Sequence, residues 1–270
     1  MSNFPTKISA MEYALVTGAS KGIGKAFVYE LASRNYHLIL TARSEPLLLG
    51  LAEEIRTKFG VEVHFYAGDL TKEEVVNGLV NLCETKGLKV NMLINNAGFG
   101  LWGKFCDLSL DEQLEMMNLN MSSLVSLTHR FLPILTQSKP SYVLNVASVA
   151  SYVAIPSFSI YAATKAFVLS FSRSLRVEMK ESGVVVCCLC PGATESEFLQ
   201  RAGMQSLGEM AGPFNMTAEQ VAKIGINGML RKKAEIVPGI INKLARGGIG
   251  LTPKRFMEMV TGKIYEDRKP

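Results

Sequence analysis

Residues 13–24 read Tyr13-Ala14-Leu15-Val16-Thr17-Gly18-Ala19-Ser20-Lys21-Gly22-Ile23-Gly24, and this stretch decides the fold of the 270-residue chain. A short apolar run ends at Gly18, and a helical pattern with Phe27 and Leu31 follows the glycines. A strand, a glycine-rich turn and a helix in this order are the context of a dinucleotide-binding turn, because glycines let the backbone approach a pyrophosphate and the helix N-terminus offers free N–H groups. The glycine spacing is one residue longer than the usual pattern, so an ordinary tight turn is the alternative interpretation.

Strand-like and helix-like stretches alternate along the chain. Further buried strands are predicted at His37–Thr41, Val61–Tyr66, Val90–Ile94, Tyr142–Val146, Val184–Cys190 and Ala234–Val237. Such alternation implies parallel strands joined by right-handed crossovers, with helices on both faces of the sheet. No internal repeat or low-complexity linker divides the sequence, so we predict one α/β domain with a doubly wound parallel sheet of about seven strands.

The composition is that of a folded protein. Hydrophobic residues make up 48% of the chain and charged residues 20%, which is enough apolar material for a sizeable core. No apolar run approaches the ~18–20 residues that span a bilayer, and residues 1–11 lack the apolar segment of a signal peptide. We therefore expect a cytoplasmic protein.

The net charge of +5 is concentrated near the C-terminus. Residues 231–270 contain ten Lys/Arg and four Asp/Glu, whereas the rest of the chain is close to neutral. This is not the broad basic surface of a nucleic-acid-binding protein, so no nucleic-acid partner is expected. Three of the five cysteines fall in the apolar run Val184–Cys190 and the three histidines are scattered, so we predict no metal site.

The end of the second predicted strand carries Thr41 and Arg43, where an acidic residue usually holds the ribose hydroxyls of NAD. Arg43 and Lys21 can both face a 2′-phosphate, and arginine offers it bidentate hydrogen bonds. This pattern favours NADP(H) over NAD(H). Two solvated surface cations are the alternative interpretation.

Polar residues also follow the third and fourth predicted strands. Asp69 stands where it can face an adenine, since ligands bind outside the carboxyl ends of parallel strands. Asp69 is otherwise structural, because Thr71 is a candidate helix N-cap with Glu74 at the capping-box position. The segment Asn95-Asn96-Ala97-Gly98 suits close approach of the backbone to a ligand, or any tight turn.

Tyr161 and Lys165 are four residues apart in a predicted helix, 158–181, and therefore lie on one face of it. An ammonium beneath a phenol favours the ionised form of a tyrosine, whose pKa is ordinarily near ~10. We therefore expect Lys165 to lower the pKa of Tyr161. Taken alone, such a pair is also common on solvated helix faces.

A second long helical region is predicted at 109–133, with a break in its phase near Asn118-Leu119-Asn120. Asparagine is a poor residue for a helix interior, and a buried amide needs hydrogen-bond partners. Asn120 is therefore expected to mark either a local kink of the helix or a water-binding site.

Taken together, these motifs resemble the short-chain dehydrogenase/reductase family over residues 11–237. The matching positions, in order, are Thr17-Gly18-x-x-x-Gly22-Ile23-Gly24, Asp69, Asn95-Asn96-Ala97-Gly98, Asn120, Ser148, Tyr161-x-x-x-Lys165 and Pro191-Gly192. Ser148 precedes Tyr161 by thirteen residues, as the family pattern requires. The resemblance implies a Rossmann-like fold, an NAD(P)(H) cofactor and oxidoreduction of an alcohol/carbonyl pair.

The resemblance also implies a role for each catalytic candidate. Tyr161 would donate a proton to the carbonyl oxygen as hydride arrives, and Ser148 would hold that oxygen near the phenol. Lys165 would hydrogen-bond the nicotinamide ribose, and Asn120 would keep a water that links Lys165 to solvent. The implied cofactor contacts are Gly18, Ser20, Lys21, Gly22, Ile23, Gly24, Arg43, Asp69, Asn96, Tyr161, Lys165, Thr194 and Ser196.

We predict that the single domain, 1–270, has three parts. Residues 11–193 form the cofactor-binding core, and residues 194–216, rich in glycine and methionine, form a lid over an apolar substrate pocket. Residues 238–270 form a basic C-terminal extension. A loose surface excursion is the alternative for the lid. The extension packs back on the domain, docks on a membrane surface or a subunit, or lies near an acidic substrate carrier such as coenzyme A or acyl carrier protein.

The predicted function is the NADP(H)-dependent interconversion of a small, apolar carbonyl compound and its secondary alcohol. The alternatives are a 3-oxoacyl-thioester reductase acting on CoA or acyl-carrier-protein substrates, a membrane-associated lipid or steroid reductase, and a non-catalytic cofactor-binding scaffold. Members of the family are commonly dimers or tetramers built on two long helices, here 109–133 and 158–181. A homodimer or homotetramer is therefore expected.

Overall fold

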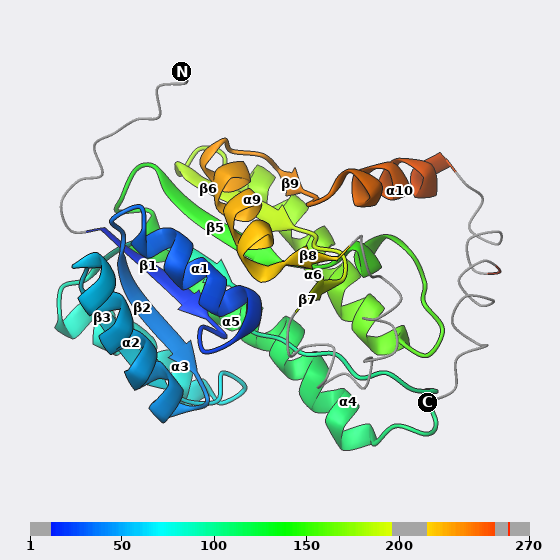
Figure 1. Ribbon diagram of the computed structural model, residues 1–270, viewed down its shortest axis with the longest axis horizontal. Coiled ribbons are helices and arrows are strands. Elements are labelled where there is room, and N and C mark those ends of the chain that lie inside the picture. Colours follow the sequence, from blue (N-terminus) through cyan, green and yellow to red (C-terminus); the bar gives the residue numbers. More distant parts are fainter. Residues whose placement is uncertain (1–11, 196–214, 252–258, 260–270) are drawn as a thin grey trace.

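A computed structural model describes residues 12–195, 215–251 and 259 of the chain (Figure 1). Its central element is a seven-stranded parallel sheet in the order β3-β2-β1-β4-β5-β6-β9, which confirms the predicted fold. The strands are β1 (Glu12–Thr17), β2 (His37–Ala42), β3 (Val63–Ala67), β4 (Lys89–Asn95), β5 (Ser141–Val146), β6 (Val184–Leu189) and β9 (Glu235–Ile236).

Helices cover both faces of this sheet. Their bounds are α1 (Gly22–Ala32), α2 (Glu45–Phe59), α3 (Glu73–Thr85), α4 (Leu110–Met117), η1 (Asn118–Ser123), α5 (Leu124–Leu135), η2 (Val149–Tyr152), α6 (Ser159–Glu178), α9 (Ala218–Leu230) and α10 (Ile240–Leu251). Successive strand residues point to opposite faces. Ala14 and Val16 of β1 therefore pack in the core formed by α1, α2 and α9, whereas Tyr13 and Leu15 pack against α3 and α5.

The position of the site follows from the strand order. From β1 the chain winds outward through β2 and β3, and then returns to add β4, β5, β6 and β9 on the other side of β1. The order therefore reverses between β1 and β4, and a parallel sheet opens a crevice at the carboxyl ends of its strands at such a point.

Cys187 and Cys190 are separated by two residues, a spacing also found in redox and metal motifs. Both residues are buried, and Cys187 belongs to the core beneath α1 and α9, whereas Cys188 and Cys190 pack against Val168 and Leu169 of α6. Alternation along the strand thus separates Cys187 from Cys190. Among the described residues no group of His, Cys, Asp and Glu has the arrangement of a metal site.

Two local expectations have different outcomes. The predicted cap at Thr71 is wrong, because α3 begins at Glu73 after Lys72, and the Thr71 N–H donates to the Asp69 Oδ1 at 2.9 Å. Asp69 thus closes a local turn just before α3, and Lys72 occupies the N-cap position. The phase break in the long helix is confirmed, because a π-helical turn, η1, separates α4 from α5.

The two ends of the predicted lid lie side by side. Strand β7 (Thr194–Glu195) pairs in parallel with β8 (Met216–Thr217). Residues 196–214, which form most of that lid, lie outside the described residues, as do 252–258 and 260–270 of the basic extension. Within the described part of the chain, no helix is both long enough and apolar enough to cross a membrane.

Candidate active site

A cavity of about 550 Å³ opens at the carboxyl ends of the central strands, where the strand order reverses. Twelve of the predicted site residues line it, namely Gly18, Ser20, Lys21, Gly22, Ile23, Arg43, Asp69, Asn96, Ser148, Tyr161, Lys165 and Thr194. Gly24 and Asn120 do not line the cavity and lie behind its wall. Ser196 lies outside the described residues.

The glycine-rich turn forms one wall of the cavity and is shaped by close backbone packing. Gly18 has a φ of +62°, which an L side chain rarely adopts. A Cβ on Gly24 would lie 2.0 Å from the Gly18 carbonyl oxygen, so only glycine lets α1 start this close to β1. Asn96 braces the same turn, since its Nδ2 donates to the Thr17 carbonyl oxygen at 3.0 Å.

Arg43 and Lys21 both line the cavity. A further contact of Arg43 has no counterpart in the motifs of the sequence. The Arg43 Nη1 lies 3.5 Å from the Glu115 Oε1 of α4, and both side chains are about half exposed. An anion that enters at Arg43 therefore meets a carboxylate as well as a guanidinium.

Asp69 has a local structural contact and also lies at the cavity. Its carboxylate accepts the hydrogen bond from the Thr71 N–H, and the residue also lines the cavity beside Leu70. An Asp that is held by a local turn in this way offers a fixed acceptor to a ligand at the β3 end of the cavity.

Ser148 and Tyr161 lie in the same region of the cavity, and different elements carry them. Ser148 follows β5 and is the N-cap of η2, where its Oγ accepts a hydrogen bond from the Ala150 N–H at 3.1 Å. Tyr161 lies in the first turn of α6 and stacks on Phe158, with ring centroids 4.2 Å apart. Burial raises the pKa of Tyr161 to about 12, although a hydrogen bond from Ser148 opposes this shift.

The expectation that Lys165 lowers the pKa of Tyr161 is wrong, because the pKa of this phenol is raised. The Lys165 Nζ lies 5.7 Å from the centre of the Tyr161 ring and donates to the Val146 carbonyl oxygen at 2.9 Å. Burial lowers the pKa of Lys165 to about 8. Desolvation of the phenol is therefore the largest influence on its pKa, and the hydrogen bond from Ser148 is the influence that opposes it.

Asn120 lies in the π-helical turn η1, where the phase of the long helix was predicted to break. Its Oδ1 accepts from the Phe99 N–H at 3.1 Å, and its Nδ2 donates to the Phe99 carbonyl oxygen at 2.9 Å and to the Thr164 Oγ1 at 3.1 Å. A Cβ on Gly98 would lie 2.7 Å from the Asn120 Oδ1. The side chain thus fixes the loop after β4 behind Lys165.

An apolar wall faces the phenol of Tyr161, and the sequence alone did not reveal it. It consists of Phe99, Leu119, Val149, Ala150, Ile155 and Phe158. Trp102 extends the aromatic cluster, with its ring centroid 5.7 Å from that of Phe158. These residues come from four separate segments, namely the loop after β4, η1, η2 and the loop before α6, and no periodic pattern in the sequence connects them. The one feature that could have pointed to this wall is the position of Phe99, directly after the Asn-Asn-Ala-Gly segment.

The chemistry of the cavity changes along its length. At the β2 end it offers cations and a glycine turn, which suit phosphates, and at the β5 end it offers a serine, a phenol, an ammonium and apolar side chains. A Cβ on either Gly18 or Gly24 would come within about 3 Å of neighbouring atoms, so there is no room for a side chain at these two positions of the turn. These residues fit a dinucleotide whose reactive ring lies beside Tyr161.

The model of the short chain dehydrogenase family matches residues 12–207. The chain belongs to this family.

Two of its relatives bear on the cofactor. The structure of a short-chain dehydrogenase from Sphingobium yanoikuyae in complex with NADPH is 30% identical and has a TM-score of 0.78, covering 89% of this chain and 95% of that one. A short-chain dehydrogenase/reductase from Burkholderia phymatum in complex with NAD is 25% identical and has a TM-score of 0.80, covering 87% and 92%. Of these two relatives of similar fold, one thus binds NADPH and the other binds NAD.

One relative bears on the substrate. A very-long-chain 3-oxoacyl-CoA reductase from Anas platyrhynchos is 34% identical over 183 residues, which are 66% of this short-chain dehydrogenase. The match spans only 58% of the length of that reductase.

Proposed function

We propose that this short-chain dehydrogenase is an NADP(H)-preferring reductase that converts a small, apolar carbonyl compound into its secondary alcohol. The observation that carries the proposal is the convergence of Ser148, Tyr161 and Lys165 at one end of a cavity whose other end is a glycine-rich turn. A bound nicotinamide dinucleotide would supply the hydride. The residues of the chain would bind that cofactor, hold the carbonyl and move the proton.

Tyr161 is the proposed proton donor. A phenol with a pKa of about 12 is protonated at neutral pH, which is the state that a general acid of carbonyl reduction needs. Ser148 is proposed to hold the carbonyl oxygen beside the phenol, since its side chain already bonds to Tyr161.

Lys165, with a pKa of about 8, is largely protonated at neutral pH. It is proposed to hydrogen-bond the ribose of the cofactor and to replace the proton that Tyr161 gives up. Asn120 is proposed to support Lys165 from behind, through the loop at Gly98.

The NADP(H) preference is proposed from the cations at the end of β2. Arg43 and Lys21 line the cavity at the place where the second strand ends, and a guanidinium binds a phosphate through two hydrogen bonds. Gly18, Ser20, Gly22, Ile23, Asp69, Asn96 and Thr194 are proposed as the further cofactor contacts. Gly24 is proposed to act indirectly, by keeping the turn tight.

The substrate class is proposed from the apolar wall beside Tyr161. Phe99, Ile155 and Phe158 offer a site for a hydrocarbon or ring next to the reacting carbonyl, and none of them carries a charge. A 3-oxoacyl thioester is the second candidate, because it has an apolar chain on its ketone and because the relative from Anas platyrhynchos bears the name of a 3-oxoacyl-CoA reductase. We further propose that the protein forms a homo-oligomer built on α4–α5 and α6 and that it is located in the cytoplasm.

A panel of carbonyl compounds tests the proposal. Purified full-length chain is mixed with NADPH or NADH, and cofactor oxidation is followed at 340 nm with benzil, androstenedione or acetoacetyl-CoA as substrate. We expect turnover of at least one apolar ketone, with NADPH as the better cofactor. Selective turnover of acetoacetyl-CoA would favour the thioester candidate. Tight NADPH binding without turnover of any compound would contradict the proposal and favour a non-catalytic scaffold.

A further inference from the structure

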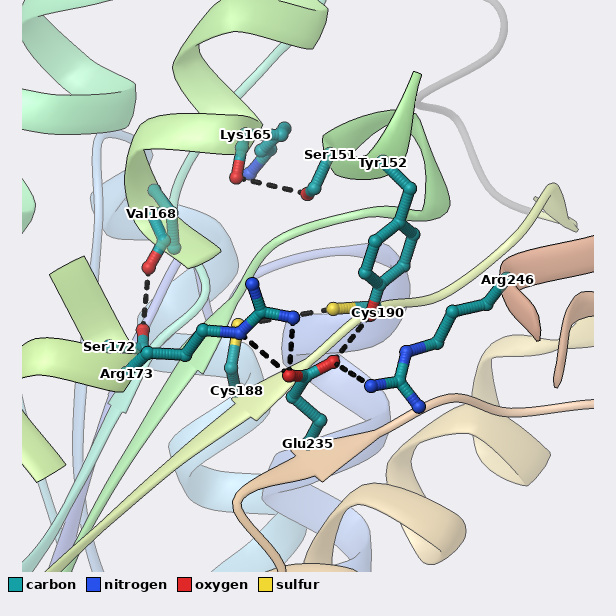
Figure 2. Close-up of polar contacts among 10 residues, drawn as sticks. All are labelled: Ser151, Tyr152, Lys165, Val168, Ser172, Arg173, Cys188, Cys190, Glu235 and Arg246. Atoms are coloured by element: carbon teal, nitrogen blue, oxygen red, sulfur yellow. Dashed lines mark hydrogen bonds and ion pairs between the residues drawn. The ribbon is translucent and has the colours of Figure 1, made fainter. Parts of the chain in front are cut away.

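Glu235 of β9 lies at the centre of a polar network behind the catalytic end of the cavity (Figure 2). Its side chain is only 12% exposed. The Oε1 accepts from the Arg173 Nε of α6 at 2.7 Å, and the Oε2 accepts from the Tyr152 hydroxyl at 2.9 Å and lies 3.0 Å from the Arg246 Nη2 of α10. A carboxylate has about four acceptor positions, and here three side chains from three different elements use them.

Tyr152 connects this network to the catalytic serine. It is the last residue of η2, the single turn for which Ser148 is the N-cap, so the two are four positions apart along the chain. The start of the turn is held by the Val149 N–H, which donates to the Pro191 carbonyl oxygen at 2.9 Å. Its middle is held by Ser151, whose Oγ donates to the Lys165 carbonyl oxygen at 2.9 Å. At its end, the hydrogen bond from Tyr152 to Glu235 fixes the turn.

Helix α10 closes the network from the other side. The Arg246 guanidinium lies 5.7 Å from the centre of the Tyr152 ring while it pairs with Glu235 (Figure 2). One turn earlier in α10, Asn242 packs against Gly192, where an added Cβ would lie 2.5 Å from the Asn242 Nδ2. The same helix therefore supports both the η2 turn and the Pro191-Gly192 turn, which line the cavity at Ala150 and Gly192.

We propose that Glu235 is a positioning residue for the reaction: by holding Tyr152 between Arg173 and Arg246, it fixes the η2 turn and thereby the orientation of Ser148 toward Tyr161. Glu235 and Tyr152 do not line the cavity, so they act on the reaction only through Ser148. Tyr152 is a hydrogen-bond donor in this arrangement, because burial, the neighbouring Cys190 and Glu235 raise its pKa well above that of a free tyrosine. The inference rests on the role proposed above for Ser148.

A substrate-independent measurement tests the positioning step. Tyr152→Phe removes the hydroxyl and leaves the ring and both Arg–Glu235 pairs in place. Hydrogen–deuterium exchange of the full chain is followed in the peptide that covers 148–153. We expect about tenfold faster exchange of the amides of this turn, as for the loss of one hydrogen bond, with no change in peptides from β1 or α3. Unchanged exchange of the η2 turn would overturn the proposal.

Kinetics test the link to catalysis. With a ketone that the wild-type chain reduces, Tyr152→Phe and Glu235→Gln are expected to lower kcat/KM about tenfold, whereas the Kd of NADPH stays within twofold. The Ser148 hydrogen bond lowers the pKa of Tyr161, so displacement of Ser148 should also raise the pKa seen in the pH profile of alcohol oxidation. In the Glu235→Gln background, Tyr152→Phe should have a smaller additional effect, since both changes act on one contact.

Two control variants separate positioning from a general loss of stability. Glu73→Gln breaks the Arg130–Glu73 pair between α3 and α5, which is remote from the cavity, and Tyr142→Phe trims a buried tyrosine of β5. Neither should shift the pH profile or the exchange of η2. If the Tyr152→Phe variant retains wild-type kcat/KM, or if its NADPH affinity falls as much as its kcat/KM, the proposal is wrong. Absence of any turnover by the wild-type chain would instead contradict the proposed function, while the exchange experiment would still decide the positioning step.

Discussion

Arg43 and Glu115 form an ion pair at the cofactor end of the cavity, with the Arg43 Nη1 3.5 Å from the Glu115 Oε1. The pair joins the end of β2 to α4, and its two side chains are about half exposed. An exposed pair of this kind contributes little to stability, about 0–1 kcal/mol. Its consequence is electrostatic. The Glu115 carboxylate partly neutralises the Arg43 guanidinium, which is proposed to bind a 2′-phosphate. The same carboxylate also repels that phosphate.

Glu115→Gln is therefore expected to strengthen NADPH binding about threefold to tenfold and to leave NADH binding unchanged, since NADH lacks the 2′-phosphate. Arg43→Ala should weaken NADPH binding by a similar or larger factor. Fluorescence titrations with both cofactors at low and high ionic strength measure this, and the effect of Glu115→Gln should shrink as salt screens it. An equal gain in affinity for both cofactors would show that Glu115 does not discriminate between them.

Tyr161→Phe is expected to lower kcat at least about a thousandfold, because the ring remains while the proton donor is lost. The Kd of NADPH should change less than threefold. Tyr142→Phe is the matched control, since Tyr142 is also a buried tyrosine but does not line the cavity. Single-turnover measurements with the best ketone of the panel distinguish loss of the chemical step from loss of binding. Retention of most of the activity by Tyr161→Phe would remove Tyr161 from the mechanism.

The sequence predicted the sheet and the positions of the motifs, because strand–helix alternation and glycine spacing are local signals. It did not predict the pKa of Tyr161, which is raised by the surroundings that α6 and its neighbours create. The pairing of Arg43 with Glu115, and of Glu235 with Tyr152, joins residues 72 and 83 positions apart. Neither pair leaves a pattern in a single sequence, because only the folded chain brings their side chains together.

Lys165→Met is expected to raise the free energy of unfolding at pH 7. Burial lowers the pKa of Lys165 to about 8 in the folded chain from 10.5, so the folded state carries the cost of a buried charge below pH 8. Between pH 8 and 10.5 the unfolded state binds the extra proton, so rising pH stabilises the wild-type fold relative to the variant. The gain of up to about 3 kcal/mol at pH 7 should therefore shrink across this range.

Urea unfolding of Lys165→Met and the wild-type chain at pH 7, 8 and 9 measures this difference. Loss of the hydrogen bond to the Val146 carbonyl oxygen reduces the gain by about 1 kcal/mol at every pH and leaves its slope unchanged. A stability difference that does not vary with pH would contradict the lowered pKa of Lys165. The same variant should lose catalytic activity, so stability and function would change in opposite directions.

Gly24→Ala is expected to abolish cofactor binding and to destabilise the fold. The added Cβ would lie 2.0 Å from the Gly18 carbonyl oxygen and 2.7 Å from the Asn96 Nδ2, so either the start of α1 or the turn must move.

Gly50→Ala provides the matched control, because Gly50 lies in α2 and a Cβ there meets no atom within 4 Å. Replacing a helical glycine by alanine stabilises a helix by about 0.5–1 kcal/mol. Thermal unfolding with and without NADPH should therefore show a higher Tm for Gly50→Ala with an unchanged shift on cofactor addition. Gly24→Ala should show a lower Tm and no rise in Tm on addition of NADPH. A normal rise in Tm with NADPH in this variant would refute the assignment of residues 18–24 as the dinucleotide-binding turn.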